Sequence, residues 1–442
     1  MSAIQGYELA PPPPVLEIAD RLERGGFETW CVGGAVRDAL LGHPHLDWDL
    51  ATAATPAEVQ RLFKRTKPIG IEFGTVGVLK GGHMFEVTTF RRDVRTDGRH
   101  AVVEFGASLD EDLARRDFTI NAIAYSPSRR RVHDPFDGRG DLERGVIRAV
   151  GDPRERMRED RLRALRAIRF AGRFGFAIEP QTWAAILESA PHLGRLSPER
   201  VKQELEKTME QVSRPARAIR RWKESGAFAT LVPPLADLPE TAIDALDHLP
   251  PPGLARRPHR AVARLAALFL HLDGRTADRT LRGLRFSNSD VAWIVALVDR
   301  WRRLGEEMTR TLVAGPADDG TLRRWAAAAG RTRLAPLLRL AAAMWDARRA
   351  AGEPAPPAER VRSTYRRALR VAWRDPIELG DLAVDGNDLA DAGIPSGPLV
   401  GKILHALVEV VIGDPSANTR ERLLAEAQRL YERYRTENGK GG

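Results

Sequence analysis

The residues best suited to chemistry begin with a glycine pair near the N-terminus, Gly33 and Gly34, which Arg37 follows. Glycines leave the backbone without side chains, so a phosphate can approach closely and the chain can adopt positive φ. We expect residues 35–41 to form a helix whose free N–H groups and positive dipole end face the same anion. Arg37 would add a forked cation beside it. The segment therefore predicts a cradle for a triphosphate.

Two carboxylates follow in the motif Asp47-Trp48-Asp49. Because residues two apart in a strand face the same side, Asp47 and Asp49 would converge while Trp48 points toward the core. Mg²⁺ prefers carboxylate oxygens of this kind together with the phosphate oxygens of a substrate. An Asp-X-Asp motif alone is common in surface turns. Beside a phosphate cradle, however, it predicts a Mg²⁺ site for nucleotidyl or phosphoryl transfer.

A third carboxylate, Glu86, lies in a predicted strand at 85–90. This strand is expected to form a hairpin with a strand at 75–79, through a turn at Gly81 and Gly82. A glutamate from such a neighbouring strand could complete the metal site, or help to position or deprotonate an attacking hydroxyl. The alternative is a solvent-facing strand glutamate, and the residues leave both interpretations open.

A second group of candidate residues lies at 115–121 and includes Arg116, Asp117 and Asn121. Arginine suits phosphate oxygens, and Asp and Asn side chains at helix-like spacing can accept from or donate to sugar hydroxyls. The plain alternative is a charged helix start with Asp117 as its cap. These residue types are therefore suited to the sugar and phosphates of a nucleotide.

A third group lies at 159–170, where Asp160, Arg163, Arg166 and Arg169 are spaced three apart. Side chains at this spacing lie along one face of a helix, and a surface ladder of weak ion pairs is the structural alternative. Adenine and cytosine present an exocyclic amino donor beside a ring-nitrogen acceptor, whereas uracil and guanine present a carbonyl beside an N–H. An accepting aspartate and a donating arginine would therefore select adenine and cytosine without a nucleic-acid template. Asp160 and Arg163 fit these two roles.

The glycine motif followed by Asp-X-Asp resembles the opening motif of the class II tRNA nucleotidyltransferase and bacterial poly(A) polymerase family, within the DNA polymerase β superfamily. The segments 85–91, 115–121 and 159–170 are similar to later motifs of that family. The resemblance implies that Asp47 and Asp49 hold Mg²⁺ and, with Glu86, serve catalysis. It also implies a nucleotide-binding set of Gly33, Gly34, Arg37, Arg116, Asp117, Asn121, Asp160, Arg163, Arg166 and Arg169.

Through this resemblance the chain is expected to add some or all of the 3′ CCA end to tRNA from CTP and ATP, releasing pyrophosphate. The RNA 3′-hydroxyl would attack the α-phosphate in line, and the metal would stabilise the attacking and leaving oxygens.

Three alternatives stay open. A poly(A) polymerase shares these motifs, although residues 70–78 are similar to the CCA-adding version. A partial CC-adding or A-adding enzyme is the second, and residues 95–100, within the loop segment 91–104, favour the complete enzyme. The alternative outside enzymes is a catalytically inactive RNA-binding protein. The presence of Asp47, Asp49, Arg116 and Asp160 argues against it.

Composition agrees with a nucleic-acid partner. The 442 residues carry a formal net charge of +9 with a pI of about 10, which favours a polyanion. No run of about 18 apolar residues exists to span a bilayer, so no membrane association is expected. The single cysteine, Cys31, cannot form an internal disulfide, and no secretory signal pattern precedes it, so we expect a cytoplasmic protein. No obligate protein partner is implied.

The order of patterns predicts an α+β protein, with a small mixed α/β nucleotidyltransferase head followed by elongated all-α regions. Short β-branched runs end near residue 150, helical periodicity follows, and loops rich in proline and glycine divide the helices. We predict a head at 1–150, a neck for nucleobase recognition at 151–225, a body at 226–350 and a tail for tRNA binding at 351–442. In the tail, Gly397, Gly401 and Lys402 could contact an RNA phosphate, and the alternative is helix capping and packing.

Overall fold

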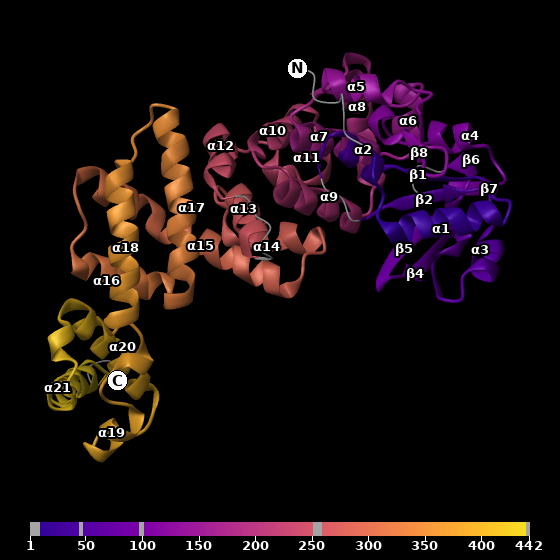
Figure 1. The fold of residues 1–442 in the computed structure, drawn as a ribbon. Coiled ribbons are helices and arrows are strands. Elements are labelled where there is room, and N and C mark those ends of the chain that lie inside the picture. The colour runs from indigo at the N-terminus through magenta and orange to yellow at the C-terminus, as the bar shows by residue number, and fades with distance from the viewer. Residues whose placement is uncertain (1–8, 44–46, 97–100, 251–258, 439–442) are drawn as a thin grey trace. The chain divides into compact units, whose positions relative to one another are not determined.

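The computed structural model describes residues 9–43, 47–96, 101–250 and 259–438. The chain forms two compact units. The first contains the residues up to Asp237 together with Gly283–Arg285, and the second contains Leu238–Arg282 and the residues from Phe286 onward. Figure 1 traces the chain through both. The finer division into head, neck, body and tail stays a prediction.

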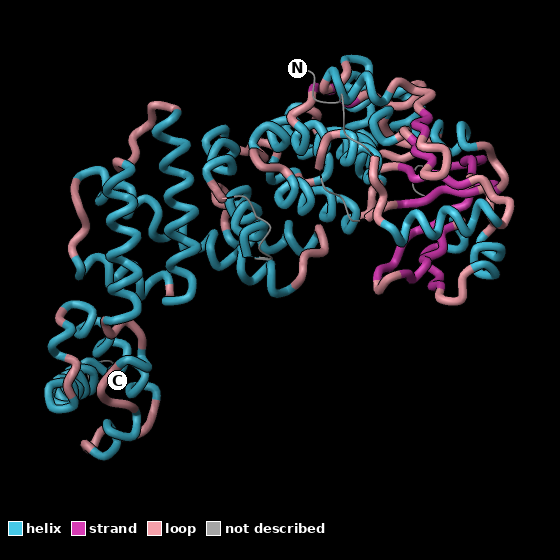
Figure 2. The backbone as a smooth tube through the Cα atoms, viewed as in Figure 1, coloured by secondary structure: helices cyan, strands magenta, loops and turns pink. Residues whose placement is uncertain are grey.

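The head is built on a seven-stranded sheet with the strand order β3-β4-β5-β2-β1-β8-β9. Figure 2 draws the strands in magenta. Its strands are β1 (Thr29–Val32), β2 (Asp49–Thr52), β3 (Thr66–Gly70), β4 (Thr75–Lys80), β5 (His83–Thr89), β8 (Ala124–Ser126) and β9 (Arg131–His133). The pair β2 and β5 is parallel, whereas the other neighbours are antiparallel. A separate ribbon is formed by β6 (Arg91–Thr96) and β7 (Ala101–Phe105).

Helices connect these strands and bury apolar side chains against them. They are α1 (Pro13–Arg24), α2 (Gly34–Leu40), α3 (Pro56–Leu62), α4 (Leu109–Ala114) and α5 (Gly138–Arg144). Capping boxes at Thr55 and Ser108 start α3 and α4, because each side chain accepts an otherwise unsatisfied N–H of the first turn. One core cluster of the head includes Trp30, Phe90 and Leu113. The mixed α/β head predicted from the sequence is confirmed.

The predicted hairpin at 75–90 is also present. β4 and β5 pair antiparallel from Thr75 opposite Thr88 to Lys80 opposite His83. Gly81 and Gly82 make the turn with φ values of +57° and +80°, a conformation that residues with a side chain rarely adopt.

The strand predicted for the Asp47-Trp48-Asp49 motif is shorter than expected. β2 starts at Asp49, so the prediction that Asp47 and Trp48 lie in the strand was wrong. The reason is that β1 ends at Val32, opposite Asp49, and Gly33 then turns that chain into α2. Trp48 is nevertheless buried, as predicted, while Asp47 is exposed and Asp49 is half-buried.

Helices complete the first unit after the head. They are α6 (Pro153–Glu159), α7 (Leu162–Phe174), α8 (Pro180–Ser189), α9 (Pro198–Gln211), α10 (Ala216–Glu224) and α11 (Ala227–Leu231). A short parallel pair, β10 (Val146–Ile147) with β11 (Ala177–Ile178), ties the end of the head to the residues that follow α7.

The helix expected for the third group of residues, at 159–170, is interrupted at Asp160. There α6 ends with extended backbone, at φ −145° and ψ 105°. Asp160 Oδ1 accepts the N–H of Leu162 at 3.0 Å, a local side-chain bond that competes with the helical pattern before α7 begins. The prediction that Asp160 shares one helix face with Arg163 and Arg166 was therefore wrong, although both arginines do lie on α7.

The second unit is helical throughout its described residues. Its helices are α12 (Glu240–His248), α13 (His259–Phe269), α14 (Gly274–Gly283), α15 (Asn288–Ala314), α16 (Asp319–Ala329), α17 (Arg331–Ala350), α18 (Ala358–Arg374), α19 (Gly386–Asp391), α20 (Pro398–Gly413) and α21 (Arg420–Asn438). Their core buries the indoles of Trp325 and Trp345, and α19–α21 share an apolar cluster that includes Leu389, Ile403 and Leu407. The predicted α+β class is confirmed. In the part of the chain that is described, no helix is long and apolar enough to cross a membrane.

Candidate active site

Gly33 makes the turn between β1 and α2 in a conformation that requires glycine. Its φ of +73° lies in the left-handed region. A Cβ built at this position would stand 3.0 Å from Nη1 of Arg116 and 3.9 Å from Oδ2 of Asp49. The backbone can therefore border the space between an arginine and a carboxylate. The predicted helix starts directly afterwards, as α2 at Gly34.

This turn lines a cavity of about 680 Å³ within the first unit. Its wall carries nine basic and four acidic side chains, namely Arg37, Arg115, Arg116, Arg163, Arg166, Arg169, Arg173, Arg200 and Lys207 against Asp47, Asp49, Asp117 and Asp160. The excess of positive charge suits a polyanion such as a triphosphate. Every residue of the predicted nucleotide-binding set lines this cavity, as do both predicted metal ligands, whereas Glu86 is not among its lining residues.

The carboxylates of the head form a shared negative field. β2 and β5 run in register with Leu50 opposite Val87, which places Glu86 next to Asp49 across the two strands. Burial, together with the negative charges of Glu86 and Asp47, raises the pKa of the Asp49 carboxyl to about 6, although the charge of Arg116 opposes this shift. Such a field attracts a cation.

The donor set fits a hard divalent cation that takes part of its coordination from the substrate. Among the described residues, no three acidic, histidine or cysteine side chains gather closely enough to hold a metal by themselves. Asp47 and Asp49 nevertheless present carboxylate oxygens to one cavity, and such cations commonly combine one or two carboxylates with substrate phosphates and water.

Arg116 is held by Asp112 with part of its hydrogen-bonding capacity unused. Asp112 is buried on α4, and its carboxylate accepts Arg115 Nε at 3.0 Å and Arg116 Nη2 at 3.1 Å. Burial alone would raise the pKa of Asp112, but the charges of Arg116 and Arg115 outweigh it and hold that pKa below its usual value. The Nε of Arg116 is buried without a hydrogen-bond partner in the described structure. A phosphate oxygen would satisfy it.

A hydrogen-bonded chain connects α2, the 3-10 turn Thr119–Asn121 and α7. Asp117 Oδ1 accepts Asn121 Nδ2 at 2.8 Å, and Asp117 Oδ2 accepts Arg166 Nε at 2.8 Å. Asn121 Oδ1 in turn accepts Nη1 of Arg37. Burial would raise the pKa of Asp117, but the charge of Arg166 and the bond from Asn121 outweigh it and lower that pKa. Asp117 is therefore an ionised anchor for both segments.

Arg37 is more enclosed than the sequence suggests. Its guanidinium is almost fully buried, pairs with Asp38 at 2.7 Å and lies over the rings of Phe170 and Phe174. Burial lowers its pKa, and the charge of Asp38 opposes that effect. Its donors thus serve the packing of α2 against α7 as well as the cavity wall.

The two predicted base-reading residues approach the cavity from different elements. Arg163 on α7 donates to Glu159 Oε2 at 2.6 Å and to the backbone carbonyls of Arg156 and Arg115. Asp160, at the break between the helices, accepts Arg200 Nη2 at 2.8 Å through its Oδ2. Both side chains are therefore held in place by protein contacts.

Arg169, the last of the arginines spaced three apart, is a buried ion-pair partner. Its Nε donates to Glu204 Oε2 at 2.7 Å and its Nη1 to Gln211 Oε1 at 3.1 Å. Burial lowers the pKa of Arg169 and the charge of Glu204 opposes this. The bonds fasten α7 to α9 at the cavity wall.

Sequence reasoning missed several side chains of this site, and two of them hold predicted residues in place. Glu159 holds both Arg163 and Arg156, and Arg200 holds Asp160. Arg200 lies in the first turn of α9, which starts at Pro198. One signal in the sequence could have pointed to Arg200. A basic residue in the first turn of a helix is disfavoured by the helix dipole, so an arginine there suggests a specific partner.

The three predicted tail residues lie at the start of α20 (Pro398–Gly413). Gly397 precedes α20, while Gly401 and Lys402 are exposed in its first turns, and the cavity in the first unit is not lined by them. Residues 97–100 of the loop segment 91–104 lie outside the described residues. Cys31 is buried in β1, and burial raises the pKa of its thiol.

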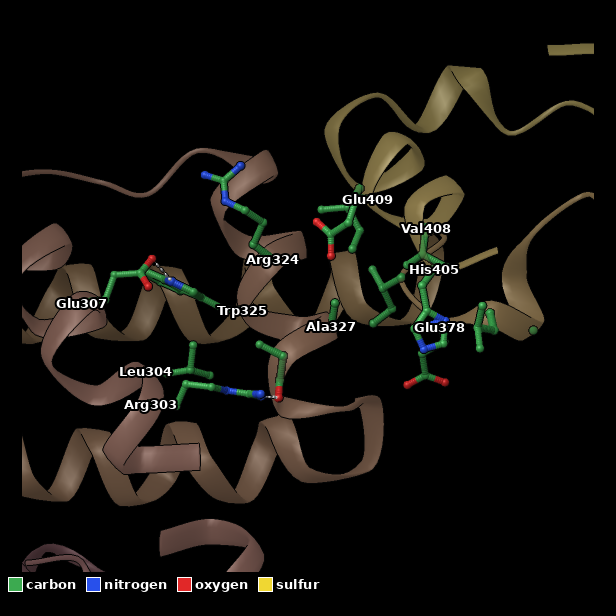
Figure 3. Close-up of a pocket in the computed structure, with 15 residues that line it drawn as sticks. Arg303, Leu304, Glu307, Arg324, Trp325, Ala327, Glu378, His405, Val408 and Glu409 are labelled. Carbon is green, nitrogen blue, oxygen red and sulfur yellow. Dashed lines mark hydrogen bonds between the residues drawn. The ribbon is translucent and has the colours of Figure 1, made fainter. Parts of the chain in front are cut away.

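A second cavity lies in the second unit, between α15, α16 and α20 (Figure 3). Its labelled acidic side chains are Glu307, Glu378 and Glu409, set against Arg303 and Arg324. Glu307 is already engaged, because it accepts the indole N–H of Trp325 at 3.0 Å. With more carboxylates than arginines, this cavity does not suit a triphosphate.

Three family models match successive parts of the chain. They describe a poly(A) polymerase head domain at 29–148, a probable RNA- and SrmB-binding site of polymerase A at 175–238, and a putative tRNA nucleotidyltransferase domain 2 at 259–427. The three together span most of the chain.

Full-length relatives are similar to the whole chain. A CCA-adding enzyme of Limosilactobacillus fermentum is 37% identical over 429 residues, which cover 96% of this chain and 97% of that protein. A CCA-adding enzyme of Geobacillus stearothermophilus is 35% identical, over 96% of this chain and 98% of that protein. The crystal structure of the Bacillus stearothermophilus CCA-adding enzyme in complex with CTP matches with a TM-score of 0.72 at 35% identity, over 97% of this chain and 100% of that one. Since the similarity extends over nearly the whole of both chains, this chain belongs to the class II family of CCA-adding enzymes and poly(A) polymerases, which are nucleotidyltransferases.

Proposed function

We propose that this chain adds the 3′ CCA end to tRNA from CTP and ATP in a Mg²⁺-dependent reaction that releases pyrophosphate. The observation that carries the proposal is the meeting of two sets of residues in one cavity. Asp47 and Asp49 are suited to the reacting phosphates, and Asp160 and Arg163 to a nucleobase. Similarity to CCA-adding enzymes over the full chain supports the same conclusion.

In this proposal the triphosphate lies against the turn at Gly33 and Gly34, with Arg116 donating its unused Nε to a phosphate oxygen. Asp47 and Asp49 would hold Mg²⁺, which when bound supplies electrostatic stabilisation to the attacking and leaving oxygens. Glu86 lies beside Asp49 and would orient the attacking 3′-hydroxyl of the RNA. The hydroxyl oxygen then forms a bond to the α-phosphorus as the bond to pyrophosphate breaks.

The base would be selected by atoms that the existing contacts leave available. Arg163 already donates three hydrogen bonds. Its Nη1 donates to Glu159 and to the carbonyl of Arg156, and its Nη2 donates to the carbonyl of Arg115. A guanidinium has five N–H donors, so its Nε and second Nη2 hydrogens remain for a ring nitrogen. A carboxylate oxygen has more than one acceptor position, so Asp160 could accept an exocyclic amino group while it stays bonded to Arg200. Uracil and guanine would present the wrong polarity to both.

The Asp117–Asn121 pair and the arginines around it would hold the ribose of the nucleotide. Asp117 is fixed by Arg166 and Asn121, so its position does not depend on the ligand. The network would bring polar groups within reach of the ribose hydroxyls and would let the cavity accept CTP and ATP in one geometry.

The test uses three tRNA substrates that lack the last one, two or three nucleotides, with CTP and ATP supplied separately and together. The complete enzyme extends all three to the same CCA end and stops there. Incorporation restricted to cytidine or to adenosine would identify a partial enzyme, and long adenosine tails on unrelated RNA would identify a poly(A) polymerase. No incorporation on any substrate would leave only a non-catalytic RNA-binding role.

Asp49→Asn gives the mechanistic arm of this test. We expect at least about a hundredfold loss of incorporation, because one of the two metal-binding carboxylates becomes a neutral amide. Asp20→Asn, at an exposed position on α1, is the matched control and should keep full activity. An Asp49→Asn variant as active as the parent would refute the metal site.

A further inference from the structure

The outer face of α18 carries a row of exposed arginines in the second unit. Arg362, Arg366 and Arg370 are exposed and spaced four residues apart, so they follow one side of the helix over about 12 Å. The opposite side packs against α16 and α17 through buried residues such as Val361, Ala368 and Val371. The row is therefore a solvent-facing surface rather than part of the core.

These three arginines differ from two other arginines of the same helix, Arg360 and Arg367. Arg360 donates to the carbonyl of Leu312, and Arg367 donates to the carbonyl of Ala317 and to Asp319, so both fasten α18 to other segments. No hydrogen bond or ion pair of Arg362, Arg366 or Arg370 is found among the residues that the structure describes. Glu359, in the first turn, is the one acidic residue of α18.

An exposed indole extends the row. Trp373 follows Arg370 on the same side of α18, and 62% of the residue is exposed, the highest value among the large apolar residues that are described. The guanidinium of Arg331 lies 5.5 Å from its ring centroid. A large aromatic side chain left in solvent beside cations is unusual in a surface without a partner, and aromatic rings serve as stacking platforms for bases.

We propose that Arg362, Arg366, Arg370 and Trp373 form a contact surface for the tRNA substrate. The arginines bind successive backbone phosphates, and the indole stacks on an unpaired base or sugar at the end of the row. The contacts are independent of sequence, because phosphates carry no base information. A row of unpaired cations ending in an aromatic ring favours RNA over an acidic protein, which needs no stacking platform. The inference rests on the proposed function, because it assigns further residues to the same substrate.

The decisive measurement is the salt dependence of tRNA binding by the full chain. We compare the parent protein with the triple variant R362Q/R366Q/R370Q, using binding titrations at several monovalent salt concentrations. Each lost phosphate contact lowers the slope of log K against log salt by roughly 0.7 to 0.9, so the triple variant should lose about 2 to 3 from that slope. Binding at low salt should weaken at least about tenfold.

The matched control removes the same net charge from other exposed positions, as R24Q/R131Q/R282Q. It should keep the parental slope to within about one. Trp373→Ala should weaken tRNA binding severalfold without changing the slope, and Trp373→Phe should restore most of the loss because a phenyl ring still stacks. CTP binding in the absence of tRNA should be unchanged in every variant, which verifies the fold.

Two outcomes would overturn the inference. One is a triple variant with parental tRNA affinity and slope, and the other is a control that loses as much as the triple variant. Failure of the proposed function is distinguishable from both, because it appears as a parent protein that incorporates neither CTP nor ATP into tRNA whatever the binding data show.

Discussion

At the scale of single residues, three positions of the site are held in arrangements that cost free energy when no ligand is bound. Gly33 cannot be replaced without strain, and its missing side chain leaves room for Arg116 and Asp49. Asp49 is held where burial and neighbouring negative charge disfavour its ionised form. Arg116 keeps a buried donor without a partner. Each is a local cost that a bound triphosphate with its cation would remove.

Substitution of Gly33 by alanine tests this at the same scale. We expect a loss of about 1 to 2 kcal/mol in unfolding free energy, because the φ of +73° disfavours a Cβ, together with a loss of CTP affinity of tenfold or more. Urea unfolding and equilibrium CTP binding are the measurements.

Gly82→Ala is the control for backbone strain. Its φ of +80° is similar, but a Cβ there meets no atom within 4 Å. It should lose comparable stability and keep CTP affinity. Equal losses of affinity in both variants would show that strain alone, rather than the space beside Arg116, accounts for the effect.

At the scale of elements, ion pairs between helices fix the cavity wall. Asp112 on α4 holds Arg115 and Arg116, Asp117 links η2 (Thr119–Asn121) to α7, and Glu204 joins α9 to Arg169. These carboxylates are buried, so the loss of one would leave uncompensated arginine charge in the wall. The binding surface and the packing of the first unit therefore depend on the same bonds.

Asp112 predicts a specific response to acid. Its pKa in the folded chain lies below the value near 3.9 of an unfolded aspartate, so the unfolded state binds the proton more readily. Its contribution to stability is thus complete above about pH 4 and is lost as pH falls through the lowered native pKa. Asp112→Asn should be about 2 to 3 kcal/mol less stable at pH 7 and should lose less further stability on acidification.

Urea unfolding at a series of pH values between 7 and 3 checks this. Asp20→Asn, at an exposed carboxylate paired with Arg24, is the control and should follow the parental curve. If Asp112→Asn had the parental free energy of unfolding at pH 7 and lost stability at low pH as the parent does, the ion pairs of Asp112 would not stabilise the cavity wall.

At the scale of the whole molecule, two kinds of positive charge coexist. The cavity of the first unit concentrates arginines that are largely buried or paired, whereas the row on α18 consists of exposed arginines. Exposed charges are screened by salt much more than buried ones. The positive charge of the chain, +9 in net terms, is thus divided between a cavity suited to a nucleotide and an exposed surface suited to tRNA.

We therefore expect salt to separate the two ligands. Between about 50 and 200 mM monovalent salt, the affinity for tRNA should fall more than about tenfold, while the affinity for CTP without tRNA falls severalfold less. Parallel titrations of both ligands at fixed Mg²⁺ check this. Equal salt slopes would contradict the separation of the two kinds of contact.

The sequence by itself determined the features that depend on short-range stereochemistry. The glycine turn before α2, the hairpin at Gly81 and Gly82, the mixed head and the helical regions follow from backbone preferences and apolar periodicity. Many of the cavity-lining residues were also foreseeable, because the motifs that carry them are local in the sequence, whereas Arg173, Arg200 and Lys207 were not. None of this required knowledge of which distant segments meet.

Only the tertiary structure decided which partner each side chain has. Arg37 is enclosed by Asp38, Asn121 and two aromatic rings, and Asp160 leaves the helix and is held by Arg200. Asn121 lies 84 residues from Arg37, and Arg200 lies 40 residues from Asp160. No periodicity encodes such a meeting. The unpaired state of the α18 row is likewise visible only in the fold, because an arginine spaced four residues from another has the same pattern whether it is bonded or free.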